Sequence, residues 1–393
     1  MLQDPVVIVG CARTPMGAFQ GELSTLTAPQ LGAIAIKAAL DRSRVPLDLV
    51  SEVYMGCVLP AGVGQAPARQ AALGAGLPQS VPCTTVGKVC GSGLKAVMLA
   101  HDAIAAGSAD IVVAGGMESM SNAPYLMDKA RGGFRMGHGK VYDHMFLDGL
   151  EDAYDKGRLM GTFAEECAAQ YGFTREQQDS FALTSLKRAQ DAQASGAFAA
   201  EIAPVTLRDK KGEQVISTDE GPRTARPDKI PTLKPAFKEG GTVTAANASS
   251  ISDGAAALVL MKRSRAQALG LPIQATLMGH SSFAQAPALF TTAPVGALSR
   301  LYSQTGWQAG DVDLYEINEA FAVVTMAAMQ EHKLPADRVN VNGGACALGH
   351  PIGASGARLL VTLVHALRQR QQHKGIATLC IGGGEAVAMA VQV

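Results

Sequence analysis

Cys90 occupies the position in this chain that is best suited to nucleophilic chemistry. It lies in VGKVCGSGLKAV, between a predicted strand and a helix that we expect to begin at about Ser92. Unpaired N–H groups and the positive end of the dipole at a helix N-terminus favour a thiolate. The two neighbouring glycines allow a backbone or a thioester to approach closely. The pattern predicts a nucleophilic cysteine, and the alternative is a buried packing residue.

Three further residues could handle protons or developing negative charge. His350 lies in the glycine-rich turn NGGACALGHPIGASG, where Pro351 holds the ring in a fixed position. Cys380 ends an apolar strand and leads into glycines whose backbone N–H groups could bind an oxyanion. Asn318, in YEINEAFAV, is either a helix N-cap or an amide that orients a water or donates to a carbonyl oxygen. The alternative for His350 is a structural histidine, and the alternative for Cys380 is a cysteine buried in a sheet.

Several common functional motifs are missing from the sequence. VVIVGCARTPMG begins like a dinucleotide-binding segment but lacks the GxGxxG spacing. No GxxxxGK[ST], HExxH, GxSxG or CxxC occurs. We therefore expect no nicotinamide cofactor, no phosphate loop, no serine hydrolase and no metal site.

Composition indicates a globular metabolic protein. The chain has 393 residues, 47% of them hydrophobic, and a formal net charge of zero, so no basic surface for nucleic acid is expected. No stretch reaches the roughly 18 uninterrupted apolar residues of a membrane-spanning helix. Seven cysteines without paired spacing favour reduced thiols and a cytoplasmic location.

Short β-branched runs alternate with Ala- and Leu-rich segments of helical period, which predicts an α/β fold. The expected strands are Val6–Val9, Glu52–Val58, Ile111–Ala114, Ala255–Met261, Leu314–Ile317, Thr378–Ile381 and Val387–Val393. The expected helices are Ala28–Arg42, Ser92–Gly107, Ala320–His332 and Ala354–Arg370.

The chain also resembles itself. Residues 90–118 and residues 353–385 each run through a Gly-rich turn, a helix and a strand, ending in VVAGGME and LCIGGGE. Two copies indicate a duplication rather than a solenoid. Between them, residues 119–245 change to Met-, Gly- and Pro-containing sequence, which predicts a long insertion over the core. The expected division is 1–118 plus about 246–270, the inserted 119–245, and 271–393.

In their joint order, the motifs of the whole chain resemble those of the thiolase family. They are ARTPMGAF, VCGSGLKA, GGMESMSNAPY, GTVTAANASSISDGAAA, NEAFA, GGACALGHPIGASG and CIGGGE. The resemblance implies two duplicated βαβαβαββ halves in a layered α-β-α-β-α core, with an inserted loop domain.

The resemblance also implies roles for the residues that match the family's motifs. Cys90 would carry the acyl group, His350 would activate it and help to hold the thioester oxygen, and Cys380 would remove the α-proton of the second substrate. Asn318 would hold an oxyanion-hole water, and the backbone of Cys90 and Gly382 would form a second oxyanion hole. The implied contacts to the coenzyme A thioester are Ser249 with the pantetheine, Arg223 near the nucleotide, and Phe237, Met160 and Phe321 along the acyl-pantetheine channel.

The implied activity is the reversible Claisen condensation of two acetyl-CoA to acetoacetyl-CoA and CoA, through an acetyl-Cys90 intermediate and without a metal or redox cofactor. A 3-ketoacyl-CoA thiolase of broader range, a ketoacyl synthase and a non-catalytic acyl-CoA-binding or lipid-binding protein are the alternatives. The family also implies a homo-oligomer, here a tetramer built as a dimer of dimers through Gly132–Met145.

Three positions depart from the family's usual pattern. Gly87 stands where relatives carry Asn, which puts the support of the loop before Cys90 in question. Leu159 replaces a His and bears on the preference for acyl-chain length, so medium-chain substrates stay possible. Cys346 replaces an aliphatic residue, and we interpret it as a packing residue.

Overall fold

The computed structural model describes residues 4–209 and 212–393. Its strands follow the order β12-β13-β14-β11-β1-β10-β5-β3-β4, with β2 paired to β10. They are β1 (Val6–Arg13), β2 (Gly17–Ala18), β3 (Glu52–Gly56), β4 (Cys83–Val86), β5 (Ile111–Ser119), β10 (Ser252–Lys262), β11 (Ala275–Ala284), β12 (Leu314–Ile317), β13 (Lys374–Ile381) and β14 (Glu385–Gln392). The hydrogen bonds connect all ten strands, but β1 and β11 share only the pairs Val7 with Thr276 and Ile8 with Ala275. We therefore describe the strands on either side of this short contact as two sheets.

The two sheets repeat one pairing pattern, and this confirms the predicted duplication. In the first half, β3 is parallel to β5, β5 is antiparallel to β10, and β10 is antiparallel to β1. In the second half, β12, β13, β14 and β11 pair in the same sequence of directions. Strand β10 completes the first sheet although the inserted segment separates it from β5 in the chain.

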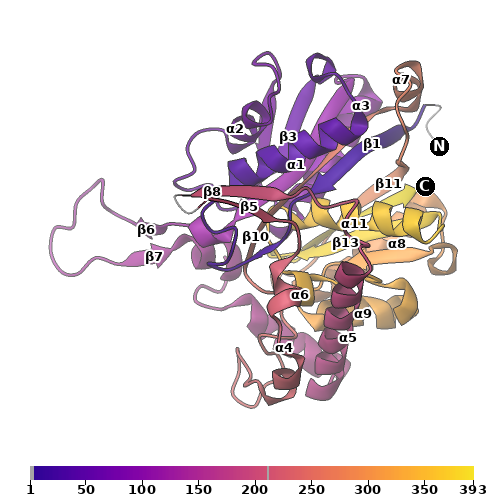
Figure 1. Ribbon diagram of the computed structural model, residues 1–393. Helices are drawn as coiled ribbons and strands as arrows, with labels where there is room; N and C mark the ends of the chain where they lie inside the picture. Colours follow the sequence, from indigo (N-terminus) through magenta and orange to yellow (C-terminus); the bar gives the residue numbers. More distant parts are fainter. Residues whose placement is uncertain (1–3, 210–211) are drawn as a thin grey trace.

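Helices cover both sheets and fill the space between them, which gives the expected α-β-α-β-α layers (Figure 1). The outer layers hold α1 (Ala28–Ser43) and α2 (Pro67–Gly74) on the first sheet, and α8 (Ala293–Thr305) and α9 (Ala322–His332) on the second. The middle layer holds α3 (Ser92–Ala106) and α11 (Ser355–Gln369). On β14, Val387 and Met389 face the middle layer while Ala386 and Ala388 face α8, as the two-residue period of a strand requires.

The middle helices meet at their N-terminal ends. A Cβ on Gly93 of α3 would lie 2.9 Å from the backbone nitrogen of Ala357, and one on Gly356 of α11 would lie 2.5 Å from that of Leu94. Both contacts require glycine, because the two backbones approach each other too closely for a side chain. The repeated Gly-rich turns therefore bring the residues that precede α3 and α11 to one place.

One helical window in the described part of the chain, Val89–Ala106, is long and apolar enough to cross a membrane by length and composition alone. Half of it is buried in the structure, where it forms α3 of the middle layer.

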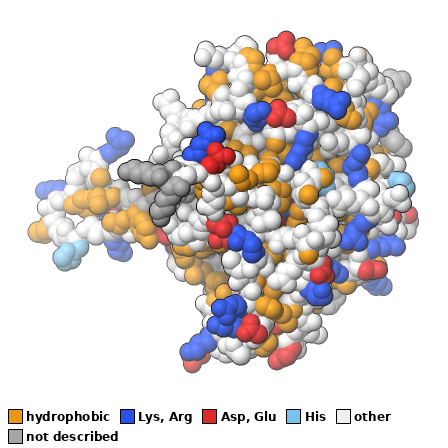
Figure 2. Space-filling view, viewed as in Figure 1, with side chains coloured by type: hydrophobic (Ala, Val, Ile, Leu, Met, Phe, Trp, Pro, Cys, Tyr) orange, Lys and Arg blue, Asp and Glu red, His pale blue; other side chains and the backbone are white. Residues whose placement is uncertain are grey.

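The inserted segment contains more regular structure than a long loop. Its elements are β6 (Tyr125–Met127), β7 (Val141–Asp143), α4 (Met160–Tyr171), α5 (Arg175–Ala194), β8 (Val205–Asp209), β9 (Gly212–Ile216) and α6 (Glu220–Thr224). The short helices α7 (Arg263–Ala268) and α10 (Ala345–Leu348) lie in the second part of the chain. The β6–β7 hairpin projects away from the body of the protein (Figure 1) and carries hydrophobic side chains on its surface (Figure 2).

Candidate active site

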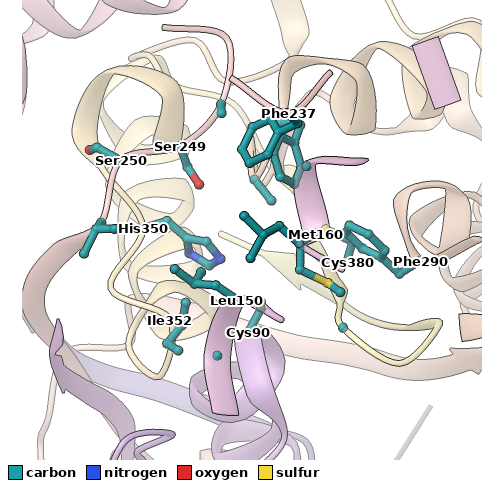
Figure 3. Close-up of a pocket in the computed structure, with 18 of the residues that line it drawn as sticks. Cys90, Leu150, Met160, Phe237, Ser249, Ser250, Phe290, His350, Ile352 and Cys380 are labelled. Carbon is teal, nitrogen blue, oxygen red and sulfur yellow. The ribbon is translucent and has the colours of Figure 1, made fainter. Parts of the chain in front are cut away.

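A cavity of about 390 Å³ opens where the two halves and the inserted segment meet. Cys90, His350 and Cys380 line it together (Figure 3), although 260 and 30 positions separate them along the chain. Its wall also includes the predicted residues Met160, Phe237, Ser249, Phe321 and Gly382. The structure thus brings together the residues for which the sequence predicts covalent and acid–base chemistry.

Cys90 is held in a short turn directly before α3. The preceding residue, Val89, has φ +42°, an unfavourable value for a β-branched side chain, so the turn is strained. The hydroxyl of Ser92 stabilises it by accepting the N–H of Lys88 at 2.8 Å and donating to the carbonyl of Val89 at 2.7 Å. The Lys88 ammonium also pairs with Glu385 of the second half. These contacts support the loop that contains Gly87, and a Cβ on Gly87 would meet nothing within 4 Å.

The position before α3 favours a thiolate at Cys90, but burial opposes it more strongly. Burial raises the pKa of the Cys90 thiol to about 11, although the backbone N–H groups of Gly382 and Cys90 act to lower it. Removing the thiol from water penalises the charged form more than the helix N-terminus favours it. Cys90 is therefore a neutral thiol at pH 7 and needs a base.

His350 has the protonation state of such a base. Burial lowers its pKa to about 3, with a further contribution from the positive charge of Arg358, so the imidazole is neutral. Its Nδ1 lies 2.5 Å from the hydroxyl of Ser355, and that hydroxyl donates its single hydrogen to the carbonyl of Pro351 at 2.9 Å. Ser355 then accepts a hydrogen from Nδ1, so Nε2 is unprotonated and can take a proton, with the amide nitrogen of Asn318 3.4 Å away as its donor.

Asn318 lies behind His350 and is not part of the cavity wall. Its side-chain nitrogen is 3.4 Å from Nε2 of His350, and its Oδ1 is buried with no hydrogen-bond partner among the described residues. A buried amide oxygen requires a donor. A water that donates to Oδ1 and to a substrate oxygen would satisfy it, which fits the role that the resemblance implies for this residue.

Cys380 stands at the end of β13, where the chain turns through glycines. Burial raises the pKa of its thiol well above the usual value, and the neighbouring Cys90 adds to this effect. Gly383 and Gly384 have φ of +92° and +87°, which non-glycine residues rarely adopt. The turn points the N–H of Gly382 at the sulfur of Cys90, beside the N–H of Cys90 itself. These two donors can hold the carbonyl oxygen of an acyl group on that sulfur.

Arg223 and Cys346 lie outside the cavity wall. Arg223 is on α6, is half exposed and pairs with Glu22 at 2.6 Å. Cys346 is 3.7 Å from the carbonyl of Glu319 and packs behind the site. Leu159, the position at which the resemblance led us to compare a His, does line the cavity.

Sequence reasoning missed two polar residues that shape the site. Ser355 sets the hydrogen-bonding state of His350, and its signal was available, because it occupies the same place in the second copy as Ser92 in the first. Glu118 accepts the N–H groups of Val58 and Leu59 and, at 2.9 Å, that of Gly353, so it fixes the turn after His350. Burial raises the pKa of Glu118 to about 7.

Several apolar wall residues carry no signal of their role in the sequence. Phe146 and Leu150 reach the cavity from a π-helical turn, and Phe290 reaches it from a 3-10 helix, and only the fold determines where these short turns lie.

Comparison with known proteins agrees with this geometry. Residues 6–264 match the family model of the thiolase N-terminal domain, and residues 271–393 match that of the thiolase C-terminal domain. The chain belongs to the thiolase family.

Relatives of this thiolase cover nearly its whole length. The acetyl-CoA acetyltransferase of Cupriavidus necator is 53% identical over 98% of the chain and 99% of that protein. Acetyl-CoA acetyltransferase 2 of Arabidopsis thaliana is 52% identical over 99% of the chain and 97% of that protein. The solved structure of an acetyl-CoA acetyltransferase from Syntrophomonas wolfei matches with a TM-score of 0.96 at 41% identity, covering 99% of both chains.

Proposed function

We propose that this thiolase condenses two acetyl-CoA reversibly to acetoacetyl-CoA and CoA, as an acetyl-CoA C-acetyltransferase. The observation that carries the proposal is the meeting of a neutral imidazole and two thiols in one cavity, with two N–H donors aimed at the Cys90 sulfur. The names of the full-length relatives support the same activity.

In the first step, Nε2 of His350 takes the proton of Cys90 while the sulfur attacks the carbonyl carbon of acetyl-CoA. The N–H groups of Cys90 and Gly382 stabilise the oxyanion, and losing one such donor typically costs roughly 3–4 kcal/mol. The bond from carbon to the CoA sulfur then breaks, and the departing thiolate takes the proton of Cys380. The products are acetyl-Cys90, free CoA, protonated His350 and the thiolate of Cys380.

In the second step, the Cys380 thiolate removes an α-proton from another acetyl-CoA. Protonated His350 and a water on Asn318 stabilise the enolate oxygen. The α-carbon attacks acetyl-Cys90, acetoacetyl-CoA leaves, and the Cys90 sulfur recovers its proton from His350. Protons and charges balance without a metal or redox cofactor, and the acyl group keeps its thioester energy on the enzyme.

Thiolysis of acetoacetyl-CoA by free CoA, compared with that of 3-ketooctanoyl-CoA, tests this function. We expect cleavage of acetoacetyl-CoA that disappears in Cys90→Ala. Leu150, Leu159 and Ile352 give the cavity an apolar wall, against which a longer acyl chain could pack. The longer substrate is therefore included for comparison. Faster cleavage of 3-ketooctanoyl-CoA would instead favour the broader-range thiolase, and cleavage of neither substrate would contradict both.

We further propose that this thiolase works as a homotetramer in the cytoplasm. The projecting β6–β7 hairpin exposes large apolar side chains, including Tyr125, Met127 and Met136. An isolated hairpin of this kind is only marginally stable in water, and exposed apolar surface commonly marks an interface. All seven cysteines are free, which fits a reducing compartment.

A further inference from the structure

Two histidines and an aspartate form a cluster away from the acyl-transfer cavity. His101 and Asp102 lie on α3, and His280 lies on β11. Within the described part of the chain, no other three His, Cys, Asp or Glu side chains bring their ligand atoms within 4.8 Å of one another. None of the three lines the cavity, and the mechanism above does not use them.

The ligand atoms of the three side chains lie within 4.8 Å of one another, and both imidazoles contact the same oxygen of Asp102. Oδ1 of Asp102 is 3.0 Å from Nδ1 of His101 and 2.8 Å from Nε2 of His280. The two imidazole rings pack edge to face, with their centroids 5.0 Å apart and an angle of 86° between their planes. In a tetrahedral zinc site with bonds of roughly 2.0–2.1 Å, the ligand atoms lie about 3.3 Å apart. Small side-chain rotations would therefore turn the observed cluster into that geometry.

The surroundings of the cluster also fit a metal ion. The side chains of His101 and His280 are only 13% and 18% exposed, which fixes their rings, while that of Asp102 is 55% exposed. Asp102 therefore leaves a path to solvent and room for a water as fourth ligand. Two imidazoles and one carboxylate are ligands that zinc and related divalent transition metals accept.

We propose that His101, Asp102 and His280 form a binding site for a divalent transition-metal ion such as Zn²⁺. The ion would be structural. Helix α3 belongs to the first half of the thiolase fold and begins two residues after Cys90, whereas β11 belongs to the second half. A metal ion held by both would link the two halves through the helix that positions the nucleophile.

Cobalt provides the direct test, because Co²⁺ replaces Zn²⁺ and absorbs visible light when it is four- or five-coordinate. The full-length protein, freed of metal by chelation, is titrated with Co²⁺. We expect visible bands that saturate at one equivalent per chain, without the near-ultraviolet charge-transfer band that thiolate ligands give. Failure to saturate at one equivalent, or a thiolate band, would overturn the proposal.

Two ligand variants and one control variant test whether His280 and Asp102 bind the ion. Asp102→Asn and His280→Gln each remove one ligand and should weaken Co²⁺ binding by more than the roughly 10- to 100-fold that loss of a supporting contact costs. His373→Gln is the matched control, because His373 is exposed and belongs to no cluster. One equivalent of Zn²⁺ should raise the Tm of the wild type and of the control, but not that of the two ligand variants. Equal affinity in all four proteins would refute the assignment.

Thiolysis without added metal shows that each variant is folded. The three residues of the cluster do not line the cavity, so activity should be retained in both ligand variants. If one variant fails to fold, the other still decides the question together with the wild-type titration.

Discussion

Cys90 and His350 meet as two neutral groups, and this decides how the nucleophile is activated. The thiol has a pKa of about 11 and the imidazole a pKa of about 3. A resting thiolate–imidazolium pair is therefore unfavourable, and the proton moves only when a thioester can accept the attacking sulfur. The neutral thiol of Cys90 therefore reacts slowly with electrophiles, while the adjacent imidazole can take its proton when a thioester is bound.

Alkylation of Cys90 should consequently depend on pH across the alkaline range. We expect the rate with iodoacetamide to rise steadily from pH 7 to pH 10, since the thiolate fraction grows until the pH reaches the thiol's pKa of about 11. The rate is measured by mass spectrometry of the peptide that contains Cys90, with and without acetyl-CoA. A plateau at neutral pH would contradict a neutral resting thiol.

Ser355 should act as a positioning residue for His350. Ser355→Ala removes the acceptor for Nδ1–H, so the imidazole can adopt the other tautomer, and we expect kcat to fall by up to roughly 100-fold. KM for acetoacetyl-CoA should stay nearly constant, because Ser355 does not line the cavity.

Ser355→Thr retains the hydroxyl and serves as the control, with kcat expected close to that of the wild type. Steady-state thiolysis at several pH values shows whether the hydroxyl positions His350 or only stabilises the fold. A rise in KM equal to the fall in kcat, in both variants, would indicate a merely structural role for the hydroxyl.

At the scale of elements, the duplication places the chemistry. Ser92 and Ser355 occupy equivalent positions at the starts of α3 and α11, and each hydroxyl stabilises the turn before its helix. Gly93 and Gly356 are equivalent too, and each allows the other helix to approach. One copy then supplies the nucleophile before its helix, and the other supplies the base.

Gly356→Ala should therefore destabilise the protein. Alanine normally gains up to about 1 kcal/mol over glycine in a helix. Here its Cβ would lie 2.5 Å from the backbone nitrogen of Leu94, and overpacking of this kind typically costs about 1–3 kcal/mol. Denaturant unfolding should show a net loss of stability together with reduced kcat.

Gly310→Ala is the matched control, since a Cβ at Gly310 would meet nothing within 4 Å. We expect no loss of stability from that change. Equal effects at both positions would mean that the close approach of α3 and α11 is not what requires glycine.

Strong local patterns made much of the fold predictable. Strands β12 and β14 and the periodic helices α1, α3 and α11 differ from the expected ranges by at most two residues at either end, whereas β5 continues to Ser119, beyond the expected end at Ala114. Strand β11 gave no clear pattern, because its buried run ends at Leu277 and its outer part is only partly covered. Helices α4 and α5 were hidden in a charged segment, and they are stabilised by packing that the sequence does not display.

The residues of the candidate site could be predicted where they lie in or next to a glycine-rich turn of one of the two repeated copies. Cys90, His350 and Cys380 all have that property, and the cavity brings them together. The depth of the cavity could not be predicted, and it reverses the expected pKa shift of Cys90. The helix dipole is a local effect visible in the sequence, whereas burial depends on segments such as Phe146–Leu150 that fold over the thiol.

At the scale of the whole molecule, the β6–β7 hairpin should govern assembly. Met136 is 97% exposed near its tip, and Met136→Asp would place a charge in any apolar contact made there. We expect light scattering to show a tetramer for the wild type and a dimer for this variant.

Val215→Asp provides the control, because Val215 is also exposed, at 57%, on the separate β8–β9 hairpin. It should leave the tetramer intact. A dimeric wild type would contradict the proposed assembly, and loss of the tetramer in both variants would contradict the assignment to β6–β7.

The short contact between β1 and β11 determines which measurement first detects a displacement of the two halves. Cys90 belongs to one half and His350 to the other, so the distance over which the proton travels is a measure of how the halves sit against each other. A slight slip at that contact would leave every strand hydrogen-bonded within its own sheet but would separate the thiol from its base. Catalytic activity therefore reports the relative position of the two halves, whereas circular dichroism reports only the secondary structure within each half. On heating, we expect activity to be lost at a lower temperature than the circular dichroism signal.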